Sequence, residues 1–286
     1  MNGEMVFRRI EVTPISGALG AEIGGVDLSR PLDDDVFAEV HRAFLDNLVI
    51  FFRDQHVTPE QHKAFGRRFG ELNVHPHYVP LAGHPEILEV LKEETATVNV
   101  GGEWHSDLSC LEKPPLGSIL YALEMPPYGG DTLFTNMYLA YERLSGGMRG
   151  LLDTLFAVHS DRTMSDPEAQ DAKNETRSSK LLSQDVGETR SEHPVVRTHP
   201  ETGRKALFVN SIFTVGFKGM TAAESRPLLQ FVFDQAQRPE VTCRFRWQKN
   251  SLAMWDNRCT QHFALNDYQG FRRLMHRVTV DGDRPY

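Results

Sequence analysis

Histidine and carboxylate pairs are the first residues in this sequence that could do chemistry. His105 and Asp107 are two positions apart, so on a strand both side chains would point to the same face. A third ligand from a distant strand would complete two histidines and one carboxylate on one face of an octahedron. Non-haem Fe(II) oxygenases use this arrangement. It leaves coordination positions open, because a cosubstrate and O2 must both bind the iron directly.

The spacing alone does not single out His105. Similar pairs recur at three other places, His159-Ser-Asp161, His84-Pro-Glu86 and His199-Pro-Glu201. For any one pair, the plainer interpretation is a surface histidine beside a solvated acid. Context favours His105, because it follows Trp104 and precedes a strand bounded by prolines, whereas His159 opens a polar segment.

A second group of polar residues lies near the C-terminal end. A strand ends in the turn-like pair Asp256-Asn257 and delivers His262, and Arg273 follows later. Arg273 and Arg277 differ by an even number, so on a strand they share a face. A guanidinium suits a carboxylate or sulfonate because it donates two parallel hydrogen bonds. The alternative is that these arginines decorate an exposed strand face.

The elements that must position these residues are mainly strands. Thr58-Pro59-Glu60-Gln61 combines an N-cap, a helix-starting proline and a capping-box glutamine, which predicts a helix. A second capping box, Thr221 with Glu224, predicts a helix to about 237, which Pro227 either delays or kinks. A further helix is expected at 137–144 and one with an apolar face around 36–44. Strands are expected at 21–26, 48–52, 117–123, 195–198, 206–209, 241–247, 252–255 and 276–280.

The segment 162–192 differs in composition from the rest of the chain. It is rich in Ser, Asp, Glu, Gln and Lys and offers little to bury. A structureless stretch this long inside a compact domain is usually a functional lid or a disordered insertion. No linker separates two self-sufficient halves. We therefore expect a single domain, 1–286, with a lid or mobile loop at 162–192.

Composition excludes several classes of protein. The 31 Lys and Arg against 39 Asp and Glu give a formal charge of −8, which argues against nucleic acid as a partner. No apolar run approaches ~20 residues, so no membrane span is expected. The cysteines, Cys110, Cys243 and Cys259, are odd in number and unrelated in spacing, which fits a reducing cytoplasm better than a disulfide framework. We expect a soluble cytoplasmic enzyme or small-ligand binder.

Six short motifs then point to a family. They are Trp104-His-Ser-Asp107, Gly129-Gly-Asp-Thr132, His193-Pro-Val-Val-Arg-Thr-His-Pro200, Trp255-Asp-Asn-Arg258, His262 and Arg273-Leu-Met-His-Arg277. With these motifs in the family's order, the chain resembles the taurine dioxygenase family of Fe(II)- and α-ketoglutarate-dependent dioxygenases, from about 17 to 285. The resemblance implies a mainly β fold with helices (α+β), a double-stranded β-helix or jelly-roll-like barrel with flanking helices.

The resemblance also implies the iron ligands and the cosubstrate site. His105, Asp107 and His262 would bind Fe(II). A small residue in place of Asp107 would leave room for a halide, as in related halogenases, so the carboxylate favours hydroxylation by O2. Thr132 and Arg273 would hold the distal carboxylate of α-ketoglutarate.

The expected substrate pocket follows from the same resemblance. Arg277 would meet the anionic group of the substrate or help bind the cosubstrate. The remaining pocket residues would be His75, Tyr78, Leu108 and Phe213. Spacing alone would also allow His75 and His77 to be loop histidines or a rival metal site.

Departures from the family keep the substrate open. Gly101-Gly102-Glu103 occupies a stretch where a polar amide contacts taurine, Leu108 replaces a pocket valine, and Ser165 stands where a pocket phenylalanine is expected. Three hypotheses follow. The first is hydroxylation of a sulfonate such as taurine, with release of succinate, CO2 and sulfite. The second is the same chemistry on an alkyl sulfate ester, aryloxyalkanoate or other carboxylic acid. The third is a non-catalytic barrel that binds a metal or ligand. Family analogy further predicts a dimer or tetramer.

Overall fold

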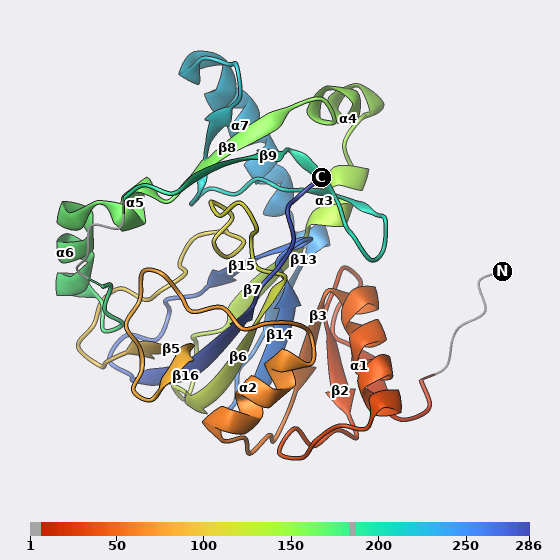
Figure 1. Cartoon of the computed structure of the whole chain (residues 1–286), viewed down its shortest axis with the longest axis vertical. Coiled ribbons are helices and arrows are strands. Elements are labelled where there is room, and N and C mark those ends of the chain that lie inside the picture. Colours follow the sequence, from red (N-terminus) through yellow and green to blue (C-terminus); the bar gives the residue numbers. More distant parts are fainter. Residues whose placement is uncertain (1–6, 183–186) are drawn as a thin grey trace.

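Strands from distant parts of the sequence form one large sheet at the centre of the molecule (Figure 1). The computed structural model describes residues 7–182 and 187–286. The sheet runs in the order β1 (Glu11–Pro14), β2 (Ala21–Gly24), β3 (Val49–Phe52), β14 (Leu252–Asp256), β6 (Gly117–Glu124), β16 (Arg273–Val280), β5 (His84–Lys92) and β4 (Pro80–Leu81).

Smaller sheets complete the β structure. One has the order β13 (Thr242–Phe245), β7 (Thr132–Asn136) and β15 (Thr260–Ala264). Another has the order β12 (Thr214–Phe217), β8 (Phe156–Ser160) and β9 (Arg190–Pro194). β10 (Val196–Thr198) pairs with β11 (Lys205–Leu207).

The apolar run of β3 shows how the core is organised. Val49 and Phe51 belong to one buried cluster, whereas Ile50 and Phe52 belong to another on the opposite face of the sheet. Alternate residues therefore point to two different interiors, which is why the run is continuous rather than alternating. Phe51 stacks on Phe245 of β13 with ring centroids 3.9 Å apart. The inner face of the large sheet thus packs against the β13-β7-β15 sheet.

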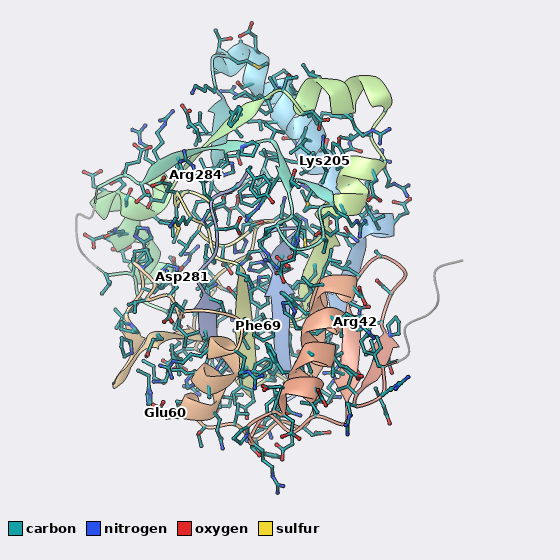
Figure 2. All side chains as sticks on the ribbon, turned by 45° about the vertical axis from the view of Figure 1, so that its right-hand side comes forward. Arg42, Glu60, Phe69, Lys205, Asp281 and Arg284 are labelled. Atoms are coloured by element: carbon teal, nitrogen blue, oxygen red, sulfur yellow. The ribbon has the colours of Figure 1, made fainter. Side chains whose placement is uncertain are left out.

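The outer face of the large sheet is covered by α1 (Asp34–Asn47) and α2 (Pro59–Arg67) (Figure 1). Phe69, labelled in Figure 2, contacts Phe44 of α1 and Phe65 of α2, with ring centroids 5.7 and 5.4 Å apart. The predicted start of α2 is confirmed, because Thr58 and Gln61 form the capping box. The β layers and outer helices confirm the predicted α+β class, with most elements being strands.

Two further helices pack against the smaller sheets, α3 (Met137–Glu142) against β11 and α7 (Ala222–Ala236) against β12. The chain also forms α4 (Gly146–Leu152) and the 3₁₀ turn η1 (Pro239–Val241). The capping box of Thr221 and Glu224 is confirmed. The alternative that Pro227 delays α7 is wrong, because the helix already begins at Ala222. The capping box supplies partners to the first turn, so Pro227 costs the helix only one backbone donor.

The segment 162–192 is not structureless, which corrects the sequence-based expectation. It contains α5 (Arg162–Ser165), α6 (Pro167–Thr176) and the first residues of β9, while 183–186 lie outside the described residues. The segment has few apolar residues, but polar side chains such as Ser179 are buried and hydrogen-bonded. A polar composition therefore does not mean that this segment is unpacked, because its polar side chains are buried through hydrogen bonds. A lid role for this segment stays a prediction.

The predicted strands are confirmed to within a few residues at their ends, with β16 beginning earlier, at Arg273. Sequence reasoning missed several strands, among them β5, β7, β8, β12 and β15. At the start of β5 it considered only His84-Pro-Glu86, as a possible ligand pair. The pairing of β5 with β16 makes it a strand, and that pairing is not visible locally. In the described part of the chain, no helix has the length and apolar character needed to cross a membrane.

Candidate active site

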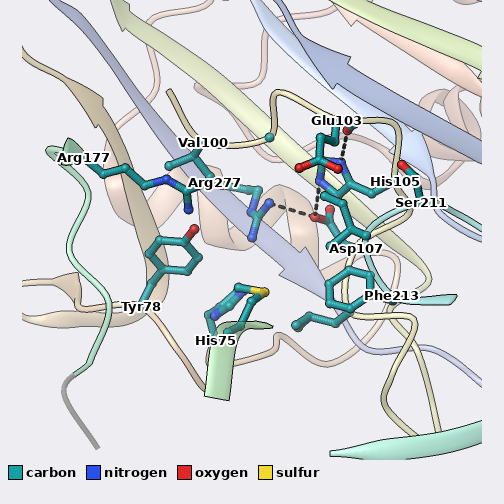
Figure 3. Close-up of a pocket in the computed structure, with 14 residues that line it drawn as sticks. His75, Tyr78, Val100, Glu103, His105, Asp107, Arg177, Ser211, Phe213 and Arg277 are labelled. Carbon is teal, nitrogen blue, oxygen red and sulfur yellow. Dashed lines mark hydrogen bonds and ion pairs between the residues drawn. The ribbon is translucent and has the colours of Figure 1, made fainter. Parts of the chain in front are cut away.

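His105, Asp107 and His262 converge at one buried point between the sheets. Their ligand atoms all lie within 4.8 Å of one another. Nε2 of His105 and Nε2 of His262 are each 3.8 Å from Oδ1 of Asp107. Figure 3 shows His105 and Asp107 on the wall of a cavity. These three side chains are the arrangement that could hold a metal ion.

Backbone pairing across two segments brings the two histidines together. His262 lies in β15, and His105 forms an isolated bridge with it through hydrogen bonds of 3.2 and 2.8 Å between their backbones. The expectation that His105 and Asp107 share a regular strand is wrong, because the chain turns at Asp107. The Ser106 hydroxyl holds the two segments together, because it donates a hydrogen bond to the backbone carbonyl of Thr260 at 2.7 Å. Leu108 has a φ of 44°, a conformation that non-glycine residues rarely adopt.

The carboxylate of Asp107 is held at both oxygens. Arg277 donates to Oδ1 at 2.9 Å, and the Ser118 hydroxyl donates to Oδ2 at 2.7 Å. Burial alone would raise the pKa of Asp107, but the charges of Arg277 and both histidines, with the Ser118 hydrogen bond, hold that pKa below its usual range. Asp107 is therefore an ionised carboxylate in a closed environment.

The two histidines beside this carboxylate are neutral imidazoles. Burial lowers the pKa of His105 and that of His262, so both imidazoles are neutral near pH 7. Nδ1 of His105 lies 2.7 Å from the carbonyl oxygen of Glu103, which accepts a hydrogen bond and therefore assigns the ring proton to Nδ1. Nε2 of His105 is left with a lone pair facing Asp107. Such a donor set suits a divalent metal, because the hydrogen bond to the other nitrogen fixes the ring.

A small cavity of about 40 Å³ adjoins these residues, and Thr132, Arg273 and Arg277 line it together. Nε and one terminal nitrogen of Arg273 are buried without a hydrogen-bond partner among the described residues. A buried cation with unused donors is costly unless an anion meets it. Thr132 accepts a hydrogen bond from the indole of Trp247 at 2.9 Å, which fixes its hydroxyl oxygen. The geometry suits an anion held by Arg273.

A larger cavity of about 370 Å³ opens beside Asp107 (Figure 3). The structure places every substrate residue expected from the sequence on its wall: His75, Tyr78, Leu108, Phe213 and Arg277. Arg277 lines both cavities, as do Val100, Gly101 and His105, so the two cavities are adjacent. The predicted residues are therefore brought together, and their individual roles stay predictions.

Sequence reasoning missed several residues of this wall: Val100, Met164, Arg177, Ser211 and Ile212. Ser165, which was aligned with a pocket aromatic, is buried against the carbonyl of Asp161 instead, and its neighbour Met164 lines the cavity. Arg177 carried no local signal, because it lies in the polar segment without a motif around it. Glu103, noted only as a departure, also lines the cavity.

The rival histidine pairs do not hold comparable sites. His159 is hydrogen-bonded to Ser109 at 3.0 Å, and Asp161 is paired with His77 at 2.9 Å, so the two residues face different partners. Nδ1 of His84 lies 3.3 Å from a carboxylate oxygen of Glu60 rather than beside Glu86.

A second buried group, His199 with Asp256 and Cys259, has metal-like proximity but a different use. Both carboxylate oxygens of Asp256 are hydrogen-bonded. Oδ1 accepts from Arg258, and Oδ2 lies 2.7 Å from a terminal nitrogen of Arg258 and 3.0 Å from Nε2 of His199. Burial raises the pKa of the Cys259 thiol well above its usual value, so it is protonated. No free ligand pair remains, and the group holds the turn before β15.

Comparison with known proteins identifies the family. The model of the taurine catabolism dioxygenase TauD, TfdA family matches residues 11–279. This chain belongs to that family. It is an α-ketoglutarate-dependent non-haem iron dioxygenase that uses Fe(II), α-ketoglutarate and O2.

Individual relatives cover nearly the whole chain. An alpha-ketoglutarate-dependent sulfate ester dioxygenase of Pseudomonas putida is 37% identical over 280 residues, covering 96% of this chain and 91% of that protein. The crystal structure of a taurine dioxygenase from Burkholderia xenovorans is 39% identical, with a TM-score of 0.82 and coverage of 97% and 93%. A structure of AAD-2 in complex with Mn(II) and N-oxalylglycine is 28% identical, with a TM-score of 0.75 and coverage of 96% and 98%. These likenesses confirm the predicted double-stranded β-helix.

Proposed function

We propose that His105, Asp107 and His262 bind Fe(II) and that Arg273, with Thr132, holds the distal carboxylate of α-ketoglutarate. The support is the donor set described above and the buried guanidinium of Arg273 beside it, two of whose nitrogens have no hydrogen-bond partner among the described residues. When bound, iron with α-ketoglutarate and O2 supplies the oxidising chemistry that hydroxylates a C–H bond and forms succinate and CO2. The residues of the chain provide position, charge and exclusion of water.

We propose further that the substrate is a small organic anion bearing a sulfate ester or sulfonate, with an alkyl sulfate ester as the first candidate. One observation carries this choice. The cavity is lined both by cationic side chains, Arg277 and Arg177, and by apolar ones, Leu108, Met164 and Phe213. An anionic head and an alkyl chain would each meet a matching surface.

His75 supports the binding of an anionic head. Its Nδ1 accepts a hydrogen bond from the backbone N–H of His77 at 3.1 Å. Burial, with the charge of Arg277 nearby, lowers the pKa of His75, so the ring is neutral and carries its proton on Nε2. That N–H is a donor on the wall of the cavity, available to an oxygen of the substrate.

The cleavage follows from hydroxylation at the carbon that bears the sulfate. The product is a hemiacetal sulfate, whose C–O bond to sulfate breaks while the hydroxyl loses its proton. The result is an aldehyde and inorganic sulfate. A sulfonate would undergo the corresponding C–S cleavage and release sulfite.

An amino sulfonate such as taurine is the second candidate, favoured by Glu103. This carboxylate lines the same cavity and could accept hydrogen bonds from an ammonium group. It occupies the stretch in which the sequence lacks the amide expected for taurine. The sulfonate hypothesis therefore has a specific residue in its favour.

A substrate panel read by succinate formation tests these proposals. Purified protein with Fe(II), α-ketoglutarate and O2 would be given hexyl sulfate, hexanesulfonate, taurine or phenoxyacetate, with sulfate and sulfite measured separately. We expect hexyl sulfate to give succinate and sulfate in equal amounts. Turnover of phenoxyacetate alone would refute the sulfur oxyanion proposal, and taurine turnover with sulfite release would favour the second candidate.

The single-domain organisation, oligomeric state and cytoplasmic location stay predictions.

A further inference from the structure

Arg177 is a second arginine of the large cavity, and the site as proposed gives it no role. It follows α6 in the segment between β8 and β9, yet it lines the same cavity as Arg277 and Tyr78. Figure 3 shows the guanidinium of Arg177 pointing toward Arg277, above the hydroxyl of Tyr78. Two guanidinium groups from different parts of the chain thus face one space.

The backbone on the C-terminal side of Arg177 is tied to the large sheet. The hydroxyl of Ser179 accepts from the backbone N–H of Leu91 at 2.7 Å, and that of Ser178 accepts from the N–H of Glu93 at 2.8 Å. Leu91 lies in β5, and Glu93 is the first residue after that strand. The two serines therefore fix the segment along the end of β5, with Arg177 next to the fixed point.

A second set of contacts joins this segment to the cavity wall. Leu181 forms a β-bridge with Tyr78, and the N–H of Val79 donates to the carbonyl of Lys180 at 3.1 Å. Tyr78 also interacts with the Arg177 side chain, through a hydrogen bond that acts to lower the tyrosine pKa, although burial raises that pKa overall. The position of Arg177 over the cavity is therefore built by both neighbouring segments.

The charge of Arg177 is not neutralised by the carboxylates of the cavity. Asp107 is already paired with Arg277 at 2.9 Å. Glu103 lies far from Arg177 in Figure 3, beside His105. Among the described residues, Nε of Arg177 and Nε of Arg277 are both buried without a hydrogen-bond partner. Two guanidinium groups whose Nε donors are unused and which face one cavity would both be stabilised by an anion between them.

We propose that Arg177 binds the anionic head of the substrate together with Arg277 and selects a head with three oxygens, a sulfate ester or sulfonate, over a carboxylate. This inference rests on the proposed function and assigns its specificity. Three donor side chains line the cavity where the head would lie, the guanidinium groups of Arg277 and Arg177 and the ring N–H of His75. A planar carboxylate has two oxygens, so it cannot offer one to each of the three donors. A tetrahedral sulfur group offers a third oxygen toward Arg177.

Binding to the inhibited protein tests this without turnover. Calorimetric titrations of hexyl sulfate and hexanoate would use protein loaded with Mn(II) and N-oxalylglycine. In Arg177→Gln, we expect the affinity for hexyl sulfate to fall at least tenfold, the affinity for hexanoate to change less than twofold, and that for N-oxalylglycine to stay unchanged. Arg177→Lys should recover part of the loss. Arg190→Gln, which removes a guanidinium with 59% side-chain exposure from the same segment, is the matched control.

Each contrary result has a distinct meaning. An unchanged affinity of Arg177→Gln for hexyl sulfate overturns the role of Arg177 and leaves the proposed substrate class intact. If Arg177→Gln loses affinity equally for hexyl sulfate and for N-oxalylglycine, the role of Arg177 is also overturned, because the substitution would then act through the fold. If the unmodified protein binds hexanoate more tightly than hexyl sulfate, both the selection by Arg177 and the sulfur oxyanion proposal fail.

Discussion

Arg277 donates a hydrogen bond to Oδ1 of Asp107 at 2.9 Å, and this is the oxygen that lies 3.8 Å from Nε2 of both His105 and His262. A single carboxylate oxygen is therefore shared between a guanidinium and the proposed metal position. The same guanidinium lines both cavities. Its positive charge favours a substrate anion but opposes a divalent cation at the histidines.

Arg277→Gln should therefore move two affinities in opposite directions. We expect Mn(II) to bind at least as tightly as in the unmodified protein, because a competing cation is removed from Asp107. The KM for hexyl sulfate should rise about 10- to 100-fold, as expected for the loss of a charged hydrogen-bond donor. Calorimetry and steady-state succinate assays would measure these effects, with Arg284→Gln as an exposed control. A tenfold weaker affinity for Mn(II) would show instead that Arg277 orients the carboxylate.

Arg273 and Arg272 provide a matched pair for the cosubstrate site. Arg273 is buried with unused donors, whereas its neighbour Arg272 faces Glu93 and Glu124 on the other side of the strand. Arg273→Gln should weaken N-oxalylglycine binding to the Mn(II)-loaded protein by roughly 1.5–3 kcal/mol, about 10- to 150-fold. Arg272→Gln should leave that affinity unchanged. Equal effects of the two substitutions would contradict the assignment of Arg273.

The ordered motifs explain why the centre of the site could be anticipated. His105, Asp107 and Arg273 lie within longer motifs, and His262 follows Trp255-Asp-Asn-Arg258 after three residues, so a local pattern marks each of them. Their common position depends on the pairing of β15 with the 105 segment, which a family resemblance supplies and periodicity does not.

The rim of the site could not be anticipated in the same way. Arg177 reaches the cavity because Ser178 and Ser179 hydrogen-bond to backbone groups at β5. Serine carries no hydrophobic signal, so the segment resembled a disordered insertion. The alignment placed Ser165 rather than Met164 in the pocket for a related reason. A polar helix has no apolar stripe, so the sequence does not show which of its residues faces the cavity.

The pair of His77 and Asp161 should hold the segment that carries Arg177. Their side chains are almost fully buried and joined at 2.9 Å, and Asp161 also accepts from the N–H of Thr189 at 2.8 Å. His77→Ala leaves a buried carboxylate with one fewer partner, at a cost of about 2 kcal/mol. We expect faster amide exchange at Thr189 and a raised KM for hexyl sulfate, with Mn(II) affinity unchanged. His84→Ala, at a partly exposed histidine, should have neither effect. Unchanged exchange at Thr189 would refute this anchoring.

Asp256 should support the fold rather than a second metal. It is 1% exposed and pairs with Arg258, which is 2% exposed. Asp256→Ala leaves that guanidinium buried without its main partner, and we expect a loss of about 3–5 kcal/mol in the free energy of unfolding. Urea denaturation would measure this loss. Metal stoichiometry should stay at about one Mn(II) per chain in Asp256→Ala and in Cys259→Ala. A fall in stoichiometry in either variant would reveal a metal at the His199 group.

Buried His62 should make the fold sensitive to mild acid. Burial lowers the pKa of His62 to about 3, against 6.5 in an exposed histidine. Between these values, the unfolded chain binds a proton that the folded chain excludes, so stability is complete above pH 6.5 and falls as the pH decreases toward 3. The contribution is about 1.4 kcal/mol per pH unit. We expect His62→Gln to reduce the slope of unfolding free energy against pH by about this amount between pH 6 and pH 5. His56→Gln, at an exposed position, should keep the full slope. A His62→Gln slope equal to that of the unmodified protein would show that the buried imidazole is already protonated in the folded state.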